Sequence, residues 1–152
     1  MFAHRVLFAA IAVLGMAACS SVPYAQRIGA RQAAYQEAAR DPVRSFRFFE
    51  LYSWEPLGDS QLAIYTRPNE AYLVSVMGPC PDLEFTDAIG LTSNLNEVQV
   101  RFDKVLTGRR DIPCTIGEIR PVDLAKLKSV EHEQRKIQSA QRDAAAADQP
   151  SP

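Results

Sequence analysis

The N-terminal segment decides which part of this chain can fold as a domain. Residues 6–14 form an unbroken apolar run behind a short basic start, and Ala17-Ala18-Cys19 follows soon after it. The run is far shorter than the ~20 residues that span a bilayer as a helix, and it matches the apolar region of a signal peptide. Small residues directly before a cysteine are typical of a lipoprotein signal. The sequence therefore predicts a lipoprotein signal peptide at residues 1–18 and lipidation of Cys19.

The mature chain would be long enough for one domain, and its charge is nearly balanced. Deleting Arg5 from the 17 basic residues leaves 16, against 18 acidic residues. No basic stripe remains to bind nucleic acid, and export excludes nucleic acid as a partner. No other apolar run is long enough to span a membrane, so acyl chains on Cys19 would provide the anchor. Ser20 stands where inner-membrane retention usually needs aspartate, which predicts the outer membrane, with the protein facing the periplasm.

Two further cysteines, Cys80 and Cys114, predict a disulfide. Both lie beside prolines, and an even pair in an oxidising compartment is typical of a crosslink. The alternative is a metal or redox site, which favours closer spacing such as C-x-x-C, and the sequence has no such motif. A bond between Cys80 and Cys114 would stabilise a small domain by roughly 3–4 kcal/mol.

Residues 43–124 predict a small sheet that the disulfide would crosslink. Short runs rich in aromatic and β-branched residues alternate there with turn residues, and the short connections favour antiparallel neighbours. The predicted strands are Phe46–Trp54, Gln61–Thr66, Ala71–Met77, Ile89–Ser93, Val98–Val105 and Thr115–Arg120. The sequence therefore predicts a mainly β (α+β) fold: a small antiparallel, curled or barrel-like sheet flanked by N- and C-terminal helices.

The two polar ends of the mature chain predict helices of different kinds. Residues 19–42 carry only a thin apolar stripe, which Gly29 weakens, so we expect a lipid-anchored tether with a loosely docked helix. Asp123 is a predicted N-cap for a helix that runs to about Arg142. The first turns of this helix are expected to pack on the sheet. The rest of residues 125–152 is expected to form a projecting polar helix and a disordered tail.

Short motifs spread between Trp54 and Asp123 resemble those of a known family. They are Ser53–Asp59, Ala71–Val74, Cys80–Leu83, Ala88–Gly90, Arg101–Asp103, Cys114–Ile116 and Ile119–Asp123. Together they resemble a family of uncharacterised proteobacterial lipoproteins with a domain of unknown function. The resemblance implies an exported, lipidated protein in which two cysteines join the middle of the domain to its last strand. It implies no activity.

The residues that usually carry catalysis are sparse. His132 is the one histidine of the mature chain, and Lys136 stands where an H-E-x-x-H zinc site needs its second histidine. We therefore expect no metal, no cofactor, and no Cys-His or Ser-His-Asp set. Carboxylates in or near predicted turns are the remaining option: Asp59, Asp82, Glu84, Asp87 and Asp103. Two of them in one cleft would form a glycosidase-like pair or bind a cation. Alternatively, Asp59 and Asp82 would cap backbone amides in turns, and Asp103 would pair with an arginine.

Four aromatic residues in the first three predicted strands form a candidate ligand surface: Tyr52, Trp54, Tyr65 and Tyr72. Exposed on one face, they would contact sugar rings or a peptide, whereas buried they would form the core of the sheet. The leading prediction is an outer-membrane-anchored periplasmic lipoprotein that binds or assembles with an envelope protein or polymer and performs no catalysis. The alternative is a carboxylate-dependent hydrolase of an envelope polymer.

Overall fold

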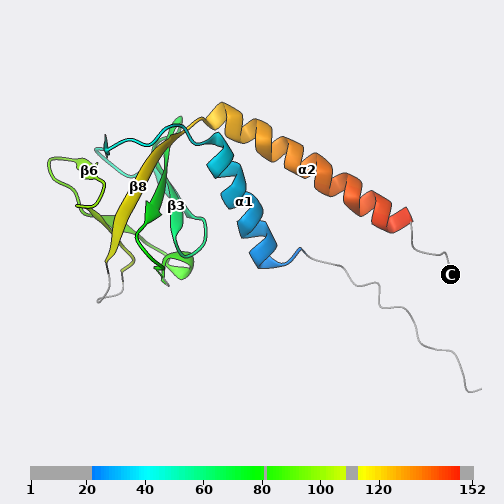
Figure 1. Cartoon of the computed structure of the whole chain (residues 1–152), viewed down its shortest axis with the longest axis horizontal. Coiled ribbons are helices and arrows are strands. Elements are labelled where there is room, and N and C mark those ends of the chain that lie inside the picture. The colour runs from blue at the N-terminus through cyan, green and yellow to red at the C-terminus, as the bar shows by residue number, and fades with distance from the viewer. Residues whose placement is uncertain (1–21, 81, 109–112, 148–152) are drawn as a thin grey trace, which may run out of the picture.

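The computed structural model describes residues 22–80, 82–108 and 113–147. The predicted signal peptide, Cys19 and the end of the predicted tail lie outside the described residues. The described elements (Figure 1) are, in chain order, α1 (Tyr24–Ala38), β1 (Ser45–Arg47), β2 (Ser53–Pro56), β3 (Gln61–Arg67), β4 (Glu70–Val76), the 3-10 helix η1 (Leu83–Phe85), β5 (Gly90–Leu91), β6 (Glu97–Gln99), β7 (Lys104–Leu106), β8 (Cys114–Val122) and α2 (Leu124–Ala147).

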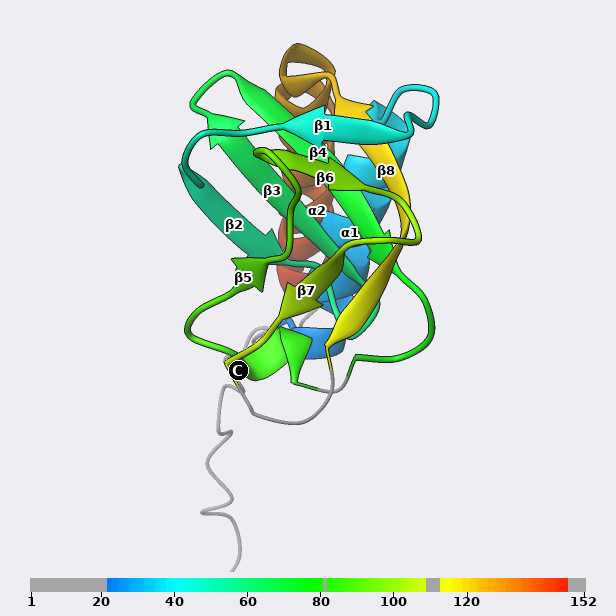
Figure 2. The ribbon, with the colours of Figure 1, turned by 90° about the vertical axis from the view of Figure 1, so that its left-hand side faces the viewer.

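Six of the strands form one curled antiparallel sheet in the order β2-β3-β4-β8-β7-β5. The other two, β1 and β6, pair with each other, and we call them the ribbon. Figure 2 shows the ribbon lying across one side of the sheet, with α1 and α2 on the other side. The predicted α+β fold, a small curled antiparallel sheet flanked by N- and C-terminal helices, is confirmed.

Alternation along the central strands divides the apolar side chains between the two sides of the sheet. In β3, Leu62 and Ile64 belong to the core under the ribbon, whereas Ala63 belongs to the core under the helices. In β4, Val74 and Leu73 divide in the same way. All five side chains are at most 2% exposed, and burial of each large one contributes about 1.5–3 kcal/mol. The sheet is therefore covered on both faces.

Helix α1 is docked on the sheet through its C-terminal half. Ala34 and Tyr35 are fully buried and Ala38 is 1% exposed. They share one core with Ala63 and Ala71 of the sheet. The expectation of a loosely docked helix is wrong for this half. Its thin apolar stripe is sufficient because the large Tyr35 side chain is fully buried and because Arg31 and Gln32 also donate hydrogen bonds to Glu55 and Gln61 of the sheet.

Helix α2 begins at its predicted cap and leaves the body of the protein. Asp123 Oδ1 accepts hydrogen bonds of 3.1 Å from two backbone amides of the first turn. Leu127 is buried at 4% exposure, whereas Ile137 is 58% exposed, and the helix continues to Ala147, past its predicted end. Figure 1 shows its distal half projecting from the body. The prediction of docked first turns and a projecting polar remainder is confirmed.

The predicted strand Phe46–Trp54 is wrong as a single element. Strand β1 ends at Arg47, and the next strand begins only at Ser53. The backbone amide of Phe48 donates to the ribbon, at Asn96 O (3.0 Å), whereas that of Tyr52 donates to the sheet, at Tyr65 O (2.9 Å). The chain crosses from one layer to the other between these points, so its aromatic residues cannot continue one ladder.

The predicted strand Val98–Val105 is also two elements, β6 and β7, separated by a turn. Asp103 Oδ2 accepts a 2.7 Å hydrogen bond from the backbone amide of Gln99, and Arg101 has a φ of 69°. A short acidic side chain that bonds nearby backbone competes with strand pairing. The alternation of Val98 and Phe102 therefore does not continue one strand face: Val98 is fully buried and Phe102 is 79% exposed.

Candidate functional site

The two cysteines form the predicted disulfide. Cys80 and Cys114 are joined with their Cα atoms 6.0 Å apart, and the bond links the segment after β4 to the start of β8. Both side chains lie in the core under the ribbon and are 2% and 7% exposed. Because both thiols are committed to a buried crosslink, neither serves as a nucleophile or a metal ligand. Their role is structural.

The four aromatic residues of the candidate ligand surface lie on both sides of the sheet. Trp54 and Tyr72 each pair with Ile64 across β2, β3 and β4, so both lie on the ribbon side. Tyr65 lies on the opposite side, in the core under the helices. Tyr52 precedes β2, and its side chain is 62% exposed. The structure thus brings Trp54 and Tyr72 to one side and separates Tyr65 from them.

A partly buried polar cluster surrounds Tyr65 beneath the helices. The Tyr35 hydroxyl lies 2.6 Å from that of Tyr65 and donates to the Glu55 carboxylate at 2.9 Å. Arg31 donates two hydrogen bonds to Glu55, of 2.5 and 2.9 Å, and also contacts Glu131 of α2. Burial, followed by the bond to Tyr65, raises the pKa of Tyr35. These groups bond to one another, so the cluster stabilises the interface between helices and sheet.

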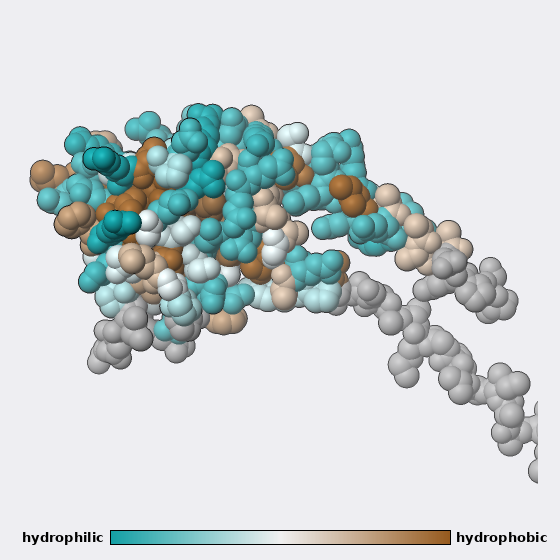
Figure 3. Space-filling model, in the orientation of Figure 1, coloured by the Kyte–Doolittle hydropathy of each residue, from teal (hydrophilic) through white to brown (hydrophobic). Residues whose placement is uncertain are grey.

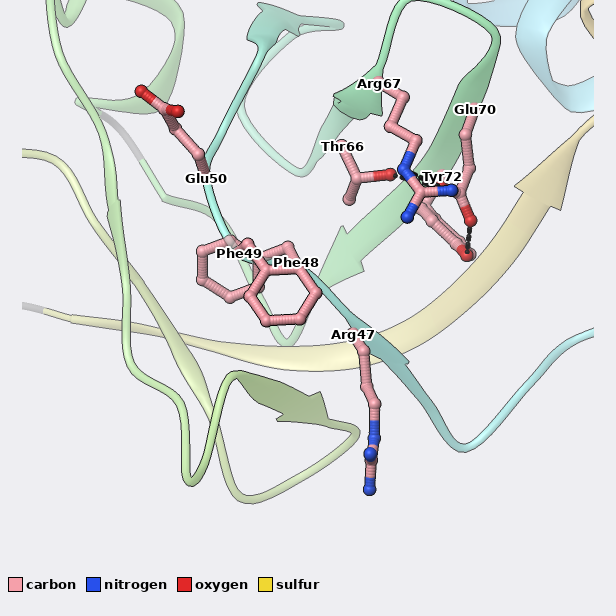
Figure 4. Close-up of a pocket in the computed structure, with 8 residues that line it drawn as sticks. All are labelled: Arg47, Phe48, Phe49, Glu50, Thr66, Arg67, Glu70 and Tyr72. Carbon is pink, nitrogen blue, oxygen red and sulfur yellow. Dashed lines mark hydrogen bonds and ion pairs between the residues drawn. The ribbon is translucent and has the colours of Figure 1, made fainter.

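A hollow of about 380 Å³ lies on the ribbon side, between the segment after β1 and the β3–β4 hairpin. We call it the hairpin hollow. Residues 47–50 form one wall, and Thr66, Arg67, Glu70 and Tyr72 form the other. Figure 4 shows Thr66 and Tyr72 converging on Glu70, while Glu50 points away. One predicted aromatic residue, Tyr72, therefore lines a polar hollow with a fixed carboxylate.

Hydrogen bonds fix the charge state of the hairpin hollow. Glu70 accepts hydrogen bonds from Tyr72 (2.8 Å) and Thr66 (2.9 Å), and Arg67 Nε lies 3.9 Å away. The bond from Tyr72, then that from Thr66, lowers the pKa of Glu70. Burial, then the bond to Glu70, raises the pKa of Tyr72 to about 12, and its ring stacks on Phe46 with centroids 4.6 Å apart. At neutral pH the carboxylate is charged and the phenol keeps its proton.

The segment between β1 and β2, residues 48–52, exposes two aromatic side chains beside this hollow, and we call it the aromatic loop. Phe49 is 90% and Tyr52 is 62% exposed. A second hollow of about 280 Å³ shares Thr66 and Arg67 with the first and extends to Tyr52. Figure 3 shows apolar side chains interrupting the hydrophilic surface at the end of the molecule where the ribbon lies. Exposed aromatic rings beside arginine can contact a sugar ring or a peptide.

The carboxylates considered for a hydrolase lie outside both hollows. Asp103 is only 9% exposed, and it accepts 2.7 Å hydrogen bonds from the Thr92 hydroxyl and the Gln99 amide. The expected pairing of Asp103 with an arginine is therefore wrong, because Thr92 occupies Oδ1 and the backbone of the turn at Gln99 occupies Oδ2. Glu84 lies in η1, beside Tyr24 of α1, and its carboxylate raises the pKa of that phenol. Asp59, Asp82 and Asp87 lie in connecting segments.

His132 lies on the surface of α2, where its side chain is 59% exposed, with Glu133 Oε1 3.6 Å from Nδ1. Within the described ranges, no three His, Cys, Asp or Glu side chains group closely enough to hold a metal ion. The helices in those ranges are also too short or too polar to cross a membrane.

Three residues of the hairpin hollow and the aromatic loop were not predicted as site residues: Phe49, Arg67 and Glu70. Phe49 was placed inside a strand that the structure divides, so its exposure could not be foreseen. Arg67 and Glu70 flank the turn between β3 and β4, and charged residues beside a turn usually face solvent. The signal that could have identified them is the Glu70-x-Tyr72 spacing, which places both side chains within hydrogen-bonding distance.

The comparisons with known proteins place the chain in a family. The model of a family described as "Family of unknown function (DUF6491)" matches residues 2–138, and the chain belongs to this family. No curated protein and no solved structure matches the chain. The prediction of a family of unknown function is confirmed, and the lipoprotein character stays a prediction.

Proposed function

We propose that this member of the family is a lipoprotein of the cell envelope that is anchored through Cys19 and acts by binding. The apolar run of residues 6–14 and the small residues before Cys19 support the anchor. Ser20 supports the outer membrane, with the protein facing the periplasm. The buried Cys80–Cys114 bond supports an oxidising compartment. The partner is an envelope protein or polymer.

The aromatic loop is the observation that carries the binding role. Its first and last residues, Phe48 and Tyr52, are fixed by backbone hydrogen bonds to the ribbon and to β3. Phe48 and Leu51 also pack on the core, whereas Phe49 between them is 90% exposed. A loop that is ordered before binding loses little conformational entropy when it binds. Exposed aromatic anchors on such a loop favour a contact surface.

The ionisable groups nearby favour binding over catalysis. Glu70 is charged and accepts two internal hydrogen bonds, and both oxygens of Asp103 accept hydrogen bonds. A general acid or base must exchange its proton with the reacting group near the working pH. The lowered pKa of Glu70 and the raised pKa of Tyr72 move both groups away from that range.

Photocrosslinking in the native host tests the binding role. A crosslinking amino acid is introduced at position 49 or 52, and at position 138 on the exposed part of α2 as the matched control. The proposal predicts a discrete adduct from positions 49 and 52, and none from position 138. Adducts that are equal at all three positions, or absent from 49 and 52, would contradict it.

The variant Cys19→Ser tests the anchor separately. The thiol is the acceptor of the first lipid, so the variant should remain an unacylated, unprocessed precursor. Fractionation and mass spectrometry of wild type and variant give the result. Normal processing of the variant would contradict the anchor and leave the binding role to the crosslinking result.

A further inference from the structure

In the described part of the chain, three non-glycine residues hold a left-handed backbone: Leu95, Asn96 and Arg101, with φ of 48°, 60° and 69°. All three lie in the two turns that flank β6. Glycine and asparagine adopt this conformation with little strain, whereas leucine and arginine do not. Strain of this kind is often retained at functional sites, so the side chains of Leu95 and Arg101 are candidates for a binding role.

The same two turns expose large apolar side chains. Leu95 is 89% exposed, and Phe102, next to Arg101, is 79% exposed. The amide of Arg101 donates a 2.7 Å hydrogen bond to Ile116 O, so this turn is tied to β8. Neither the strain nor the exposure stabilises the folded domain. Their coincidence on both turns of one strand favours contact with a partner.

A hollow of about 630 Å³ lies beside the turn that holds Arg101, and we call it the ribbon hollow. It is lined by residues 44 and 45, 97, 99–102 and 117. Within the described ranges, no ion pair or side-chain hydrogen bond engages the guanidinium of Arg44 or Arg101. The acid in this hollow, Glu97, is already engaged by the Ser45 hydroxyl (2.5 Å) and by Arg47 (3.4 Å). The ribbon hollow therefore presents two unpaired positive charges.

We propose that the ribbon hollow binds a carboxylate-bearing segment of an acidic peptide from a partner protein. Arg44 and Arg101 would bind its carboxylates, because the guanidinium fork matches a carboxylate in two parallel hydrogen bonds. Phe102 would contact an apolar side chain next to the acidic residue. This site is separate from the hairpin hollow and does not rest on the function proposed for the aromatic loop.

The position and composition of the ribbon hollow favour a peptide over a lipid surface or a free anion. A small inorganic anion would leave Phe102 exposed. The ribbon lies on the side of the sheet opposite to α1, the helix nearest the predicted anchor in sequence (Figure 2). A membrane that holds the protein through its N-terminus would therefore lie away from the ribbon hollow.

Fluorescence anisotropy with labelled peptides tests the proposal on the full-length protein in detergent. The probe is a pool of pentapeptides in which Asp or Glu alternates with apolar residues, and its control is the same pool with Asn and Gln. The acidic pool should bind more tightly. Arg101→Gly and Arg44→Gln should each weaken its binding at least about tenfold, the loss expected for a single charge-assisted hydrogen bond, of which each guanidinium can form two. Asn96→Gly, which changes a left-handed residue outside the hollow, should leave binding unchanged.

The melting temperature separates a binding role of Arg101 from a structural one. Arg101→Gly relieves the left-handed strain, so its melting temperature should equal or exceed that of wild type while binding is lost. Equal binding of the two pools, or wild-type binding by Arg101→Gly or by Arg44→Gln, would overturn the proposal. Arg101-dependent binding to phosphatidylglycerol vesicles without binding to the acidic pool would overturn it in favour of a lipid surface.

Discussion

Aromatic and charged residues lie on both sides of the sheet, but they have different surroundings on each side. Beneath the helices, Tyr35, Tyr65, Arg31 and Glu55 form one hydrogen-bonded cluster, in which Tyr35 is fully buried and Tyr65 is half-buried. On the ribbon side, Phe49 and Tyr52 of the aromatic loop are exposed to solvent. Phe49 is 90% exposed, whereas Tyr35 is fully buried. Aromatic composition alone therefore does not distinguish a core from a contact surface.

Structural residues on this sheet are buried and have hydrogen-bond partners within the protein, whereas the candidate binding residues are exposed. A buried hydroxyl that loses its partner destabilises the fold, so residues under the helices are constrained by folding. An exposed aromatic side chain adds little to folding, so its presence calls for another explanation. The predictions below use this contrast, from the largest expected change in the free energy of unfolding to the smallest.

The largest effect is expected from the disulfide in the core under the ribbon. The double variant Cys80→Ser/Cys114→Ser should lose about 3–4 kcal/mol of unfolding free energy, because the bond closes a loop with a sequence separation of 34 residues. Denaturant titration of the variant and of wild type measures the loss. An unchanged transition midpoint would mean that the crosslink does not stabilise this side of the sheet.

Tyr35→Phe should have an intermediate effect on the helix side. It removes the hydroxyl that donates to Glu55 and bonds Tyr65, and should cost about 1–3 kcal/mol. The matched control is Tyr52→Phe on the ribbon side, where the side chain is 62% exposed and a change within about 0.5 kcal/mol is expected. Equal losses of unfolding free energy in the two variants would show that the hydrogen bonds of Tyr35 do not stabilise the fold.

The Glu70–Tyr72 pair should give a pH dependence with two arms. The pKa of Glu70 is lowered in the folded state, so its contribution is complete above the ordinary glutamate pKa and is lost as the pH falls through the lowered value. The pKa of Tyr72 is raised to about 12, so its contribution is complete below the ordinary tyrosine pKa of 10.0 and is lost as the pH rises towards 12.

Unfolding measured across this pH range checks the pair. Tyr72→Phe should weaken both arms, and the alkaline contribution that remains should come from Tyr35, whose pKa is also raised. Tyr52→Phe, on an exposed tyrosine of the aromatic loop, should change neither arm. If the unfolding free energy of Tyr72→Phe followed the same pH dependence as that of wild type, the Glu70–Tyr72 pair would not be its source.

The smallest effect on stability is expected from the aromatic loop itself. Phe49→Ser/Tyr52→Ser removes two exposed side chains and should change the free energy of unfolding by no more than about 0.5 kcal/mol per site. Denaturant titration again gives the value. A loss of several kcal/mol would show that these rings belong to the fold, as Tyr35 does.

Local patterns predict most of the fold. Alternating apolar residues identify β3 and β4, Asp123 marks the start of α2, and the parity of the cysteines identifies the disulfide. Each of these signals depends on residues close together in the sequence or on the number of cysteines. They are therefore visible without the structure.

The missed features depend on contacts between segments that are distant in sequence. The break between β1 and β2 arises because Phe48 bonds to Asn96 and Tyr52 bonds to Tyr65. The docking of α1 depends on Arg31 and Tyr35 of the helix bonding to Glu55 of β2. Of the candidate ligand surface, Tyr52 and Tyr72 line the adjoining hollows, while Tyr65 is half-buried on the helix side of the sheet. Strand alternation cannot assign this division before the helices are placed.

The most direct test of the contrast between the two sides is the crosslinking yield from position 52, per folded molecule, in Tyr35→Phe and in Phe49→Ser. Native-gel quantification of folded protein normalises the yield. If the helix side serves folding and the ribbon side serves binding, Tyr35→Phe should retain the wild-type yield despite its lower stability, and Phe49→Ser should lose most of it despite normal stability. The reverse pattern, or an equal loss in both variants, would contradict the account.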